Sequence, residues 1–84
     1  MTVEKARIFI KKAATDHQLR DRLNEAPTQE AVDTLLEAEG LPFTHVEFAE
    51  AYSYLLARSQ SAEEASLIRE IKCWWDYLLA IVNM

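Results

Sequence analysis

The segment Glu37-Ala-Glu-Gly-Leu-Pro-Phe-Thr-His-Val-Glu-Phe48 ends one helix and begins another within a few residues. Gly40 can adopt the positive φ of a residue just past a helix C-terminus, and Leu41 supplies the apolar contact that accompanies this motif. Pro42 cannot continue the helix. The segment therefore predicts a tight connection between two helices.

The residues after Pro42 predict a strong helix start. Thr44 is a good N-cap and Glu47 stands three positions later, which is the pattern of a capping box. Phe43 and Phe48 occupy the two positions of a hydrophobic staple. Together these signals predict a helical hairpin.

The rest of the chain repeats the same signals. The first helix is expected to begin at a Thr2 cap. A second capping-box pattern at Thr15 and Gln18 predicts either a new short helix or a bend in the first helix. Thr28 is expected to cap the next helix, and Ser61 with Glu64 forms a third capping-box pattern. A long helix is then expected over residues 62–82. The sequence predicts an all-α fold, a small bundle of four to five helices in a single domain over residues 1–84.

Size and composition limit the possible functions. The chain has 84 residues, half of them hydrophobic, and a net charge of −5. Residues 1–22 carry a basic excess and residues 23–66 a strong acidic one, so nucleic-acid binding is not expected. The two regions could pair within the fold, or could form two solvated faces, which we favour. No apolar run is long enough for a membrane span, and a single cysteine fits a cytoplasmic location.

The last helix carries more apolar surface than one core contact needs. Its apolar positions cover about 160° of the helix, where a stripe of about 100° is usual. Either the helix lies in a groove and is covered on both flanks, or one flank binds a protein partner or a second copy of the chain. The anchors that we expect on such a flank are Trp74, Trp75, Leu78 and Ile81.

Residues that could perform chemistry are few. His17 and His45 lack other ligands at metal spacing, and Cys73 lacks a nearby base. Because Gly40 is the only glycine, phosphate-binding loops are excluded. We expect no enzymatic activity, no cofactor and no metal. A small-molecule or metal-responsive regulator that uses one of these three side chains is a weaker alternative.

Three segments resemble the Nif-eleven family of small proteins associated with nitrogen fixation. They are Glu4–Ile10, Thr15–Ala26 and Glu37–Phe48, and the resemblance covers about residues 1–56. One position differs, because Leu36 stands where the family favours alanine. Residues 62–82 would be an additional C-terminal helix.

The resemblance implies a bacterial protein of one of two types. Some family members are leader segments of ribosomally made modified peptides, which maturation enzymes read and cut after a double glycine. Others stand alone and have no established activity. This chain has no Gly-Gly pair and no Ser/Thr/Cys-rich segment after its acidic helix. We therefore expect a stand-alone interaction protein, with a leader-like precursor as the alternative.

Overall fold

The computed structural model describes residues 3–83, and every regular element within them is an α-helix. The helices are α1 (Val3–Thr15), α2 (His17–Asn24), α3 (Gln29–Ala38), α4 (His45–Ala57) and α5 (Ala62–Val82). The predicted all-α fold and the long C-terminal helix are therefore confirmed. The cap expected at Thr2 lies outside the described residues.

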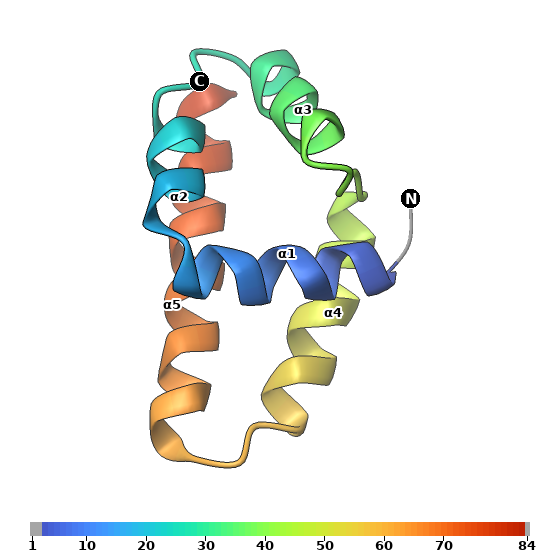
Figure 1. Cartoon of the computed structure of the whole chain (residues 1–84), viewed down its shortest axis with the longest axis vertical. Coiled ribbons are helices and arrows are strands. Elements are labelled where there is room, and N and C mark those ends of the chain that lie inside the picture. The colour runs from blue at the N-terminus through green and yellow to red at the C-terminus, as the bar shows by residue number, and fades with distance from the viewer. Residues whose placement is uncertain (1–2, 84) are drawn as a thin grey trace.

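Helices α4 and α5 form a hairpin, and α1 crosses it at a steep angle (Figure 1). Helix α1 packs against α4, α5 and α2. Helix α3 lies at the end of the molecule where α5 finishes, as Figure 1 shows. The Cα radius of gyration is 12.1 Å and the extents are 35 × 22 × 22 Å. The long axis is therefore only slightly longer than α5, which at about 1.5 Å per residue spans about 32 Å.

An aromatic cluster forms the centre of the core. The ring of Phe9, on α1, lies 5.0 Å from that of Trp75 on α5 and 5.1 Å from that of Phe43 before α4, measured between centroids. Phe48 stacks on Trp75 at 5.5 Å. Each of these rings comes from a different segment, so the cluster joins α1, α4 and α5. All five helices contribute buried apolar side chains to the surrounding core.

The connection between α3 and α4 is a Schellman motif. Gly40 has a φ of +70°, and its N–H donates to the carbonyl of Glu37 at 3.0 Å. The N–H of Leu41 donates to the carbonyl of Leu36 at 2.9 Å. Both leucines are buried in the same core cluster, as expected for the apolar residues of this motif. Leu36 thus packs within the core at the position where it differs from the family pattern.

The predicted capping box at the start of α4 is confirmed. The Glu47 N–H donates to the Thr44 hydroxyl at 3.1 Å, and the Thr44 N–H donates to the Glu47 carboxylate at 2.7 Å. The rings of Phe43 and Phe48 lie 5.9 Å apart, as a hydrophobic staple requires. Local sequence therefore determines where α4 begins and how the chain enters it.

The other two predicted capping boxes need correction. Asp16, not Thr15, caps α2, because α1 continues through Thr15 and the Asp16 carboxylate accepts from two backbone N–H groups. Ser61 does cap α5. The Glu64 carboxylate, however, accepts from the Gln60 N–H at 3.4 Å rather than from Ser61, so the reciprocal bond of a capping box is not formed.

Candidate binding surfaces on the C-terminal helix

The four anchors expected on α5 have different environments. Trp75 and Leu78 are only 3% and 4% exposed, because they belong to the stripe of α5 that faces the core. Trp74 is half-buried, and Ile81 is 47% exposed. The expectation that Trp75 and Leu78 lie on a surface is therefore wrong for the isolated chain. Ile81 is the one expected anchor that is well exposed.

Trp74 connects two helices of the chain. Its indole Nε1 donates to Oδ1 of Asn24 at 2.8 Å. The guanidinium of Arg20 lies 5.6 Å from the centroid of the indole. Both partners are on α2, so the ring attaches α2 to α5 and only part of it remains accessible.

Exposed apolar side chains follow one side of α5. Leu67 and Ile81 are each 47% exposed and Tyr77 is 68% exposed. At about 100° per residue they fall within one arc of the helix, together with exposed Glu63 and Glu70. We call these five residues the outer flank of α5. Of these five, only Ile81 was among the anchors expected from the sequence.

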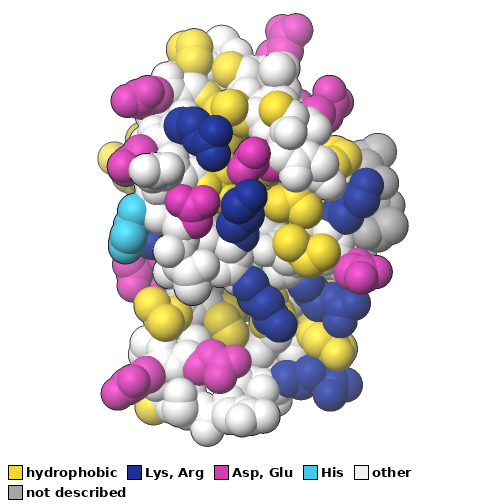
Figure 2. All heavy atoms as spheres, viewed as in Figure 1, with side chains coloured by type: hydrophobic (Ala, Val, Ile, Leu, Met, Phe, Trp, Pro, Cys, Tyr) yellow, Lys and Arg dark blue, Asp and Glu magenta, His cyan; other side chains and the backbone are white. Residues whose placement is uncertain are grey.

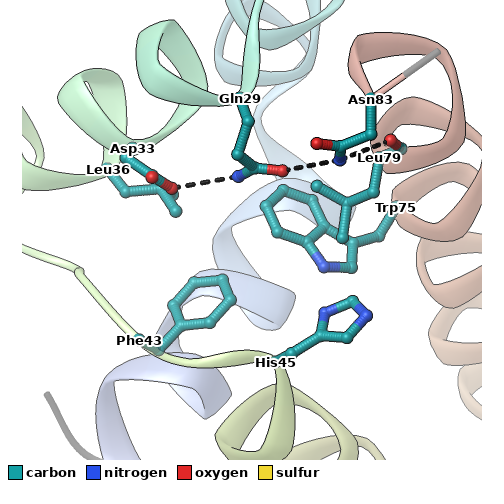
Figure 3. A pocket seen from close by; sticks show the side chains of 8 residues that line it. All are labelled: Gln29, Asp33, Leu36, Phe43, His45, Trp75, Leu79 and Asn83. Carbon is teal, nitrogen blue, oxygen red and sulfur yellow. Dashed lines mark hydrogen bonds between the residues drawn. The ribbon is translucent and has the colours of Figure 1, made fainter.

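A pocket lies on the other side of α5, between its last turns, α3 and the start of α4 (Figure 3). Its volume is about 370 Å³. The side chains that line it are Gln29, Asp33, Leu36, Phe43, His45, Trp75, Leu79 and Asn83. This pocket could not be predicted from the sequence, because its lining residues come from distant segments and share no motif.

A chain of hydrogen bonds borders the pocket. The Gln29 amide donates to Asp33 at 3.0 Å, and the Asn83 amide donates to the Gln29 oxygen at 3.0 Å. The Asn83 amide also donates to the Leu79 carbonyl at 2.8 Å. These bonds join the N-terminus of α3 to the C-terminus of α5, so one wall of the pocket is polar and held in place.

The Trp75 indole nitrogen is the unusual atom of this pocket. Nε1 is buried and has no hydrogen-bond partner among the described residues. Figure 3 shows its nitrogen-bearing edge turned toward the imidazole of His45. An indole N–H can only donate, and a buried donor without an acceptor is rare in native proteins.

Glu39 brings part of the basic N-terminal region to the acidic middle of the chain. Its carboxylate accepts from Lys12 at 2.9 Å and from Arg22 at 3.4 Å. The hydrogen bond and charge of Lys12 hold the pKa of Glu39 below its usual range. On the face that α1 crosses, Figure 2 shows basic side chains gathered across the middle of the molecule, with acidic ones between and around them. The two charged regions therefore pair at this point.

The remaining side chains that could bind a metal or act as a nucleophile are dispersed. His45 lies at the pocket, whereas His17 opens α2 and Cys73 is exposed on α5. Over residues 3–83 there is no group of three or more His, Cys, Asp or Glu side chains that could hold a metal ion. None of the described helices has the length and hydropathy needed to cross a bilayer.

Comparison with known proteins gives a family match. Residues 1–48 match the family model described as the Nif11 domain, which is more than half of the chain. The matched segment ends inside α4, earlier than residue 56, where the resemblance was expected to end. No curated protein and no solved structure matches the chain significantly. The match includes the Schellman turn, the capping box and the staple, and it shows that the chain belongs to the Nif11 family.

Proposed function

We propose that this chain is a non-enzymatic protein-binding module whose contact surface is the outer flank of α5. The observation that carries the proposal is the exposure of Leu67, Tyr77 and Ile81 along one side of a single helix. Tyrosine and large aliphatic side chains are effective anchors when a partner buries them. Leu67 and Ile81 lie about 21 Å apart along α5. Trp74 falls between them in the same arc and is partly covered by α2, so the accessible contacts of a partner are Leu67 on one side of α2 and Tyr77 with Ile81 on the other.

The charges beside the flank indicate the chemistry of the partner. Glu63 and Glu70 are exposed on the same side of α5, although Glu70 also lies 3.8 Å from the guanidinium of Arg20, and the whole chain carries a net charge of −5. A partner helix with apolar anchors flanked by Lys or Arg would complement both features. We therefore propose a basic amphipathic helix as the occupant of the flank. A second copy of this acidic chain would complement it less well.

The side chains with shifted pKa values support a non-enzymatic role. Asp76 raises the pKa of Lys72 through a salt bridge on the surface of α5, and Lys12 lowers that of Glu39. Both shifts arise from surface ion pairs. Enzyme active sites instead shift pKa values by burial in a cleft beside a reacting group. The proposal includes the cytoplasmic location and the bacterial, nitrogen-fixation-associated setting that the sequence predicts.

Two synthetic helical peptides with the same apolar pattern test the proposal. One carries Lys and the other Glu at the flanking positions, and binding is measured by calorimetry at low and high salt. We expect the Lys peptide to bind the unchanged protein, and to bind it more weakly as the salt concentration rises. It should not bind the protein with the double substitution Tyr77→Ser, Ile81→Ser. Equal binding of both peptides, or no binding of the Lys peptide, contradicts the proposal.

The matched control is Val46→Ser, because Val46 is 67% exposed but lies on α4. It should bind the Lys peptide as the unchanged protein does, and far-UV circular dichroism should confirm that all variants are folded. Sedimentation without peptide tests for a second copy as the occupant. If the unchanged protein sediments as a dimer and the double variant as a monomer, the occupant of the flank is a second copy of the chain and not a basic helix.

The family match favours a second candidate function. Because residues 1–48 match the Nif11 domain, which also occurs as a precursor-peptide leader, a maturation enzyme could read this chain. The intact mass of the protein from its own host decides between the two. A mass near the 9.7 kDa of the printed sequence supports a stand-alone module. A shortened or chemically modified product supports the precursor role.

A further inference from the structure

The two neighbouring tryptophans of α5 differ in how their N–H groups are satisfied. The Trp74 N–H donates to Asn24, whereas the Trp75 N–H is buried without an acceptor in the part of the chain that the structure describes. Trp75 is 3% exposed, so its N–H has also lost the water that would otherwise accept its proton. A ligand that supplies an acceptor at this atom would therefore gain a hydrogen bond in a site of low dielectric constant.

The surroundings of the Trp75 nitrogen indicate what can reach it. Figure 3 shows its edge turned toward the imidazole of His45, on the side of the pocket opposite the Gln29–Asn83 bonds. His45 is exposed and no hydrogen bond from residues 3–83 holds its imidazole, so this side chain can turn away without disrupting the core. The remaining walls include Leu36, Phe43 and Leu79, which favour an apolar body.

The polar border of the pocket selects against anions. Asp33 uses only Oδ1 to accept from Gln29, so its second oxygen and its negative charge remain at the border. Both hydrogen bonds of the Asn83 amide use its nitrogen, so the Asn83 oxygen is also available as an acceptor. A ligand should therefore present N–H donors or a positive charge to Asp33 and Asn83, and an uncharged oxygen to the Trp75 nitrogen.

We propose that this pocket binds an apolar amide. The carbonyl oxygen of the amide accepts from Trp75 Nε1, its aliphatic or aromatic body packs between Leu36, Phe43 and Leu79, and its N–H groups face Asp33 and Asn83. A volume of about 370 Å³ is at the lower end of the range of about 300–1,000 Å³ for ligand pockets, so the ligand is small. A free metabolite or one apolar residue of a peptide would present the same chemistry.

This inference does not depend on the proposed function. The pocket residues Trp75 and Leu79 lie on the side of α5 away from Tyr77 and Ile81, given about 100° per residue. Substitutions at the outer flank should leave amide binding unchanged, and substitutions in the pocket should leave binding of the Lys peptide unchanged. Failure of one proposal is thus distinguishable from failure of the other.

Nuclear magnetic resonance of the ¹⁵N-labelled full chain provides a direct test. The chain has two tryptophans and therefore two indole N–H signals, which a Trp74→Phe variant assigns. The probe is N-acetyl-leucinamide at millimolar concentrations. We expect a saturable downfield shift of the Trp75 signal. The Trp74 signal should stay in place, because its proton is already hydrogen-bonded to Asn24. Acetamide, which has the carbonyl but no apolar body, should produce no saturable shift.

A variant that fills the pocket and a matched control complete the experiment. Leu79→Phe should abolish the shift, whereas Leu67→Phe, at an exposed site of the same helix, should retain it. If Leu79→Phe does not fold, Asp33→Leu replaces it and should weaken binding by removing an acceptor for the amide N–H groups. A longer peptide, N-acetyl-Gly-Leu-Gly-amide, distinguishes a peptide ligand from a free metabolite. Tighter binding than that of N-acetyl-leucinamide indicates a peptide, and weaker binding indicates a free amide.

Two results would overturn the inference. A Trp75 signal that does not move when the probe is in large excess would show that no amide reaches the nitrogen. A Trp75 signal that is already downfield without probe, and that moves upfield in His45→Ala, would show that the imidazole of His45 is the acceptor. In that case the pocket closes itself and is not a ligand site.

Discussion

Trp74 and Asn24 are fifty residues apart in the chain, and the Trp74 indole donates a hydrogen bond of 2.8 Å to the Asn24 side-chain oxygen. This bond fastens the short helix α2 to α5. Trp74→Phe keeps an aromatic ring but removes the donor together with the five-membered ring of the indole, and Asn24→Ala removes the acceptor. Each should lower the free energy of unfolding by about 0.5–1.5 kcal/mol, and the double variant by less than the sum. Urea denaturation measures these values. Asn24→Asp, which keeps an acceptor, should lower the free energy of unfolding by less than Asn24→Ala.

Gly40 should resist substitution for backbone reasons alone. Its φ is +70°, and a Cβ atom built there meets no other atom within 4 Å. Gly40→Ala should therefore cost about 1–2 kcal/mol, because only the left-handed backbone penalises the new side chain. Gly40→Asn should cost less, since asparagine adopts this conformation more readily. Equal losses for the two variants in thermal unfolding would contradict this explanation.

The capping box of α4 and the single cap of α5 should respond differently to mutation. Thr44→Ala and Ser61→Ala should each cost about 1 kcal/mol, because each removes one N-cap acceptor. In a double-mutant cycle, Thr44 should couple to Glu47, since their bonds are reciprocal. Ser61 and Glu64 should show almost no coupling, since the Glu64 carboxylate accepts from Gln60 instead. Urea midpoints of the single and double variants test both statements.

Leu36→Ala should be strongly destabilising, although alanine is what the family pattern favours there. Leu36 is 4% exposed and its backbone closes the Schellman turn with Leu41. Truncating a buried leucine typically costs about 2–5 kcal/mol. Leu35→Ala, at a half-buried site of the same helix, is the control and should cost less. If the two losses are alike in urea denaturation, Leu36 is not the core residue that its burial indicates.

Glu39 should make stability depend on pH in the acid range. Lys12 lowers the pKa of Glu39 in the folded chain, so the unfolded chain binds more protons as the pH falls. Its contribution is therefore complete above the ordinary glutamate pKa of about 4.3, and is lost as the pH falls through the lower folded value. Glu39→Gln should lower the free energy of unfolding at neutral pH. In acid, the variant and the unchanged protein should have similar free energies of unfolding. Exposed Glu37→Gln is the control for the change in net charge.

Local features of this fold could be predicted from the sequence, because their determinants are close together. The turn at Gly40, the cap at Thr44 and the staple of Phe43 and Phe48 depend on groups within a few residues of each other. Asp16 shows the limit of this reasoning. Two adjacent residues could cap α2, and the aspartate does so because α1 extends through Thr15.

The roles of the two tryptophans could not be predicted in the same way. The amphipathic pattern places both in one broad stripe, and only tertiary packing makes Trp75 a core residue and Trp74 the partner of Asn24. The pocket was missed for a similar reason. Its polar border forms only where Gln29, at the start of α3, meets Asn83, at the end of α5. No pattern within either helix indicates that meeting.

The way α1 lies across the α4–α5 hairpin has a consequence for the order of folding. Phe9 on α1 packs on Phe43 and Phe48 but also on Trp75, so part of the face of the first helix stays open until the last helix is available. The matched segment 1–48 contains α1 but none of α5, so on its own it would leave the part covered by Trp75 in water. Contacts over such long sequence separations slow folding relative to bundles of consecutive neighbours. A nascent chain should therefore stay sensitive to proteolysis until α5 emerges from the ribosome.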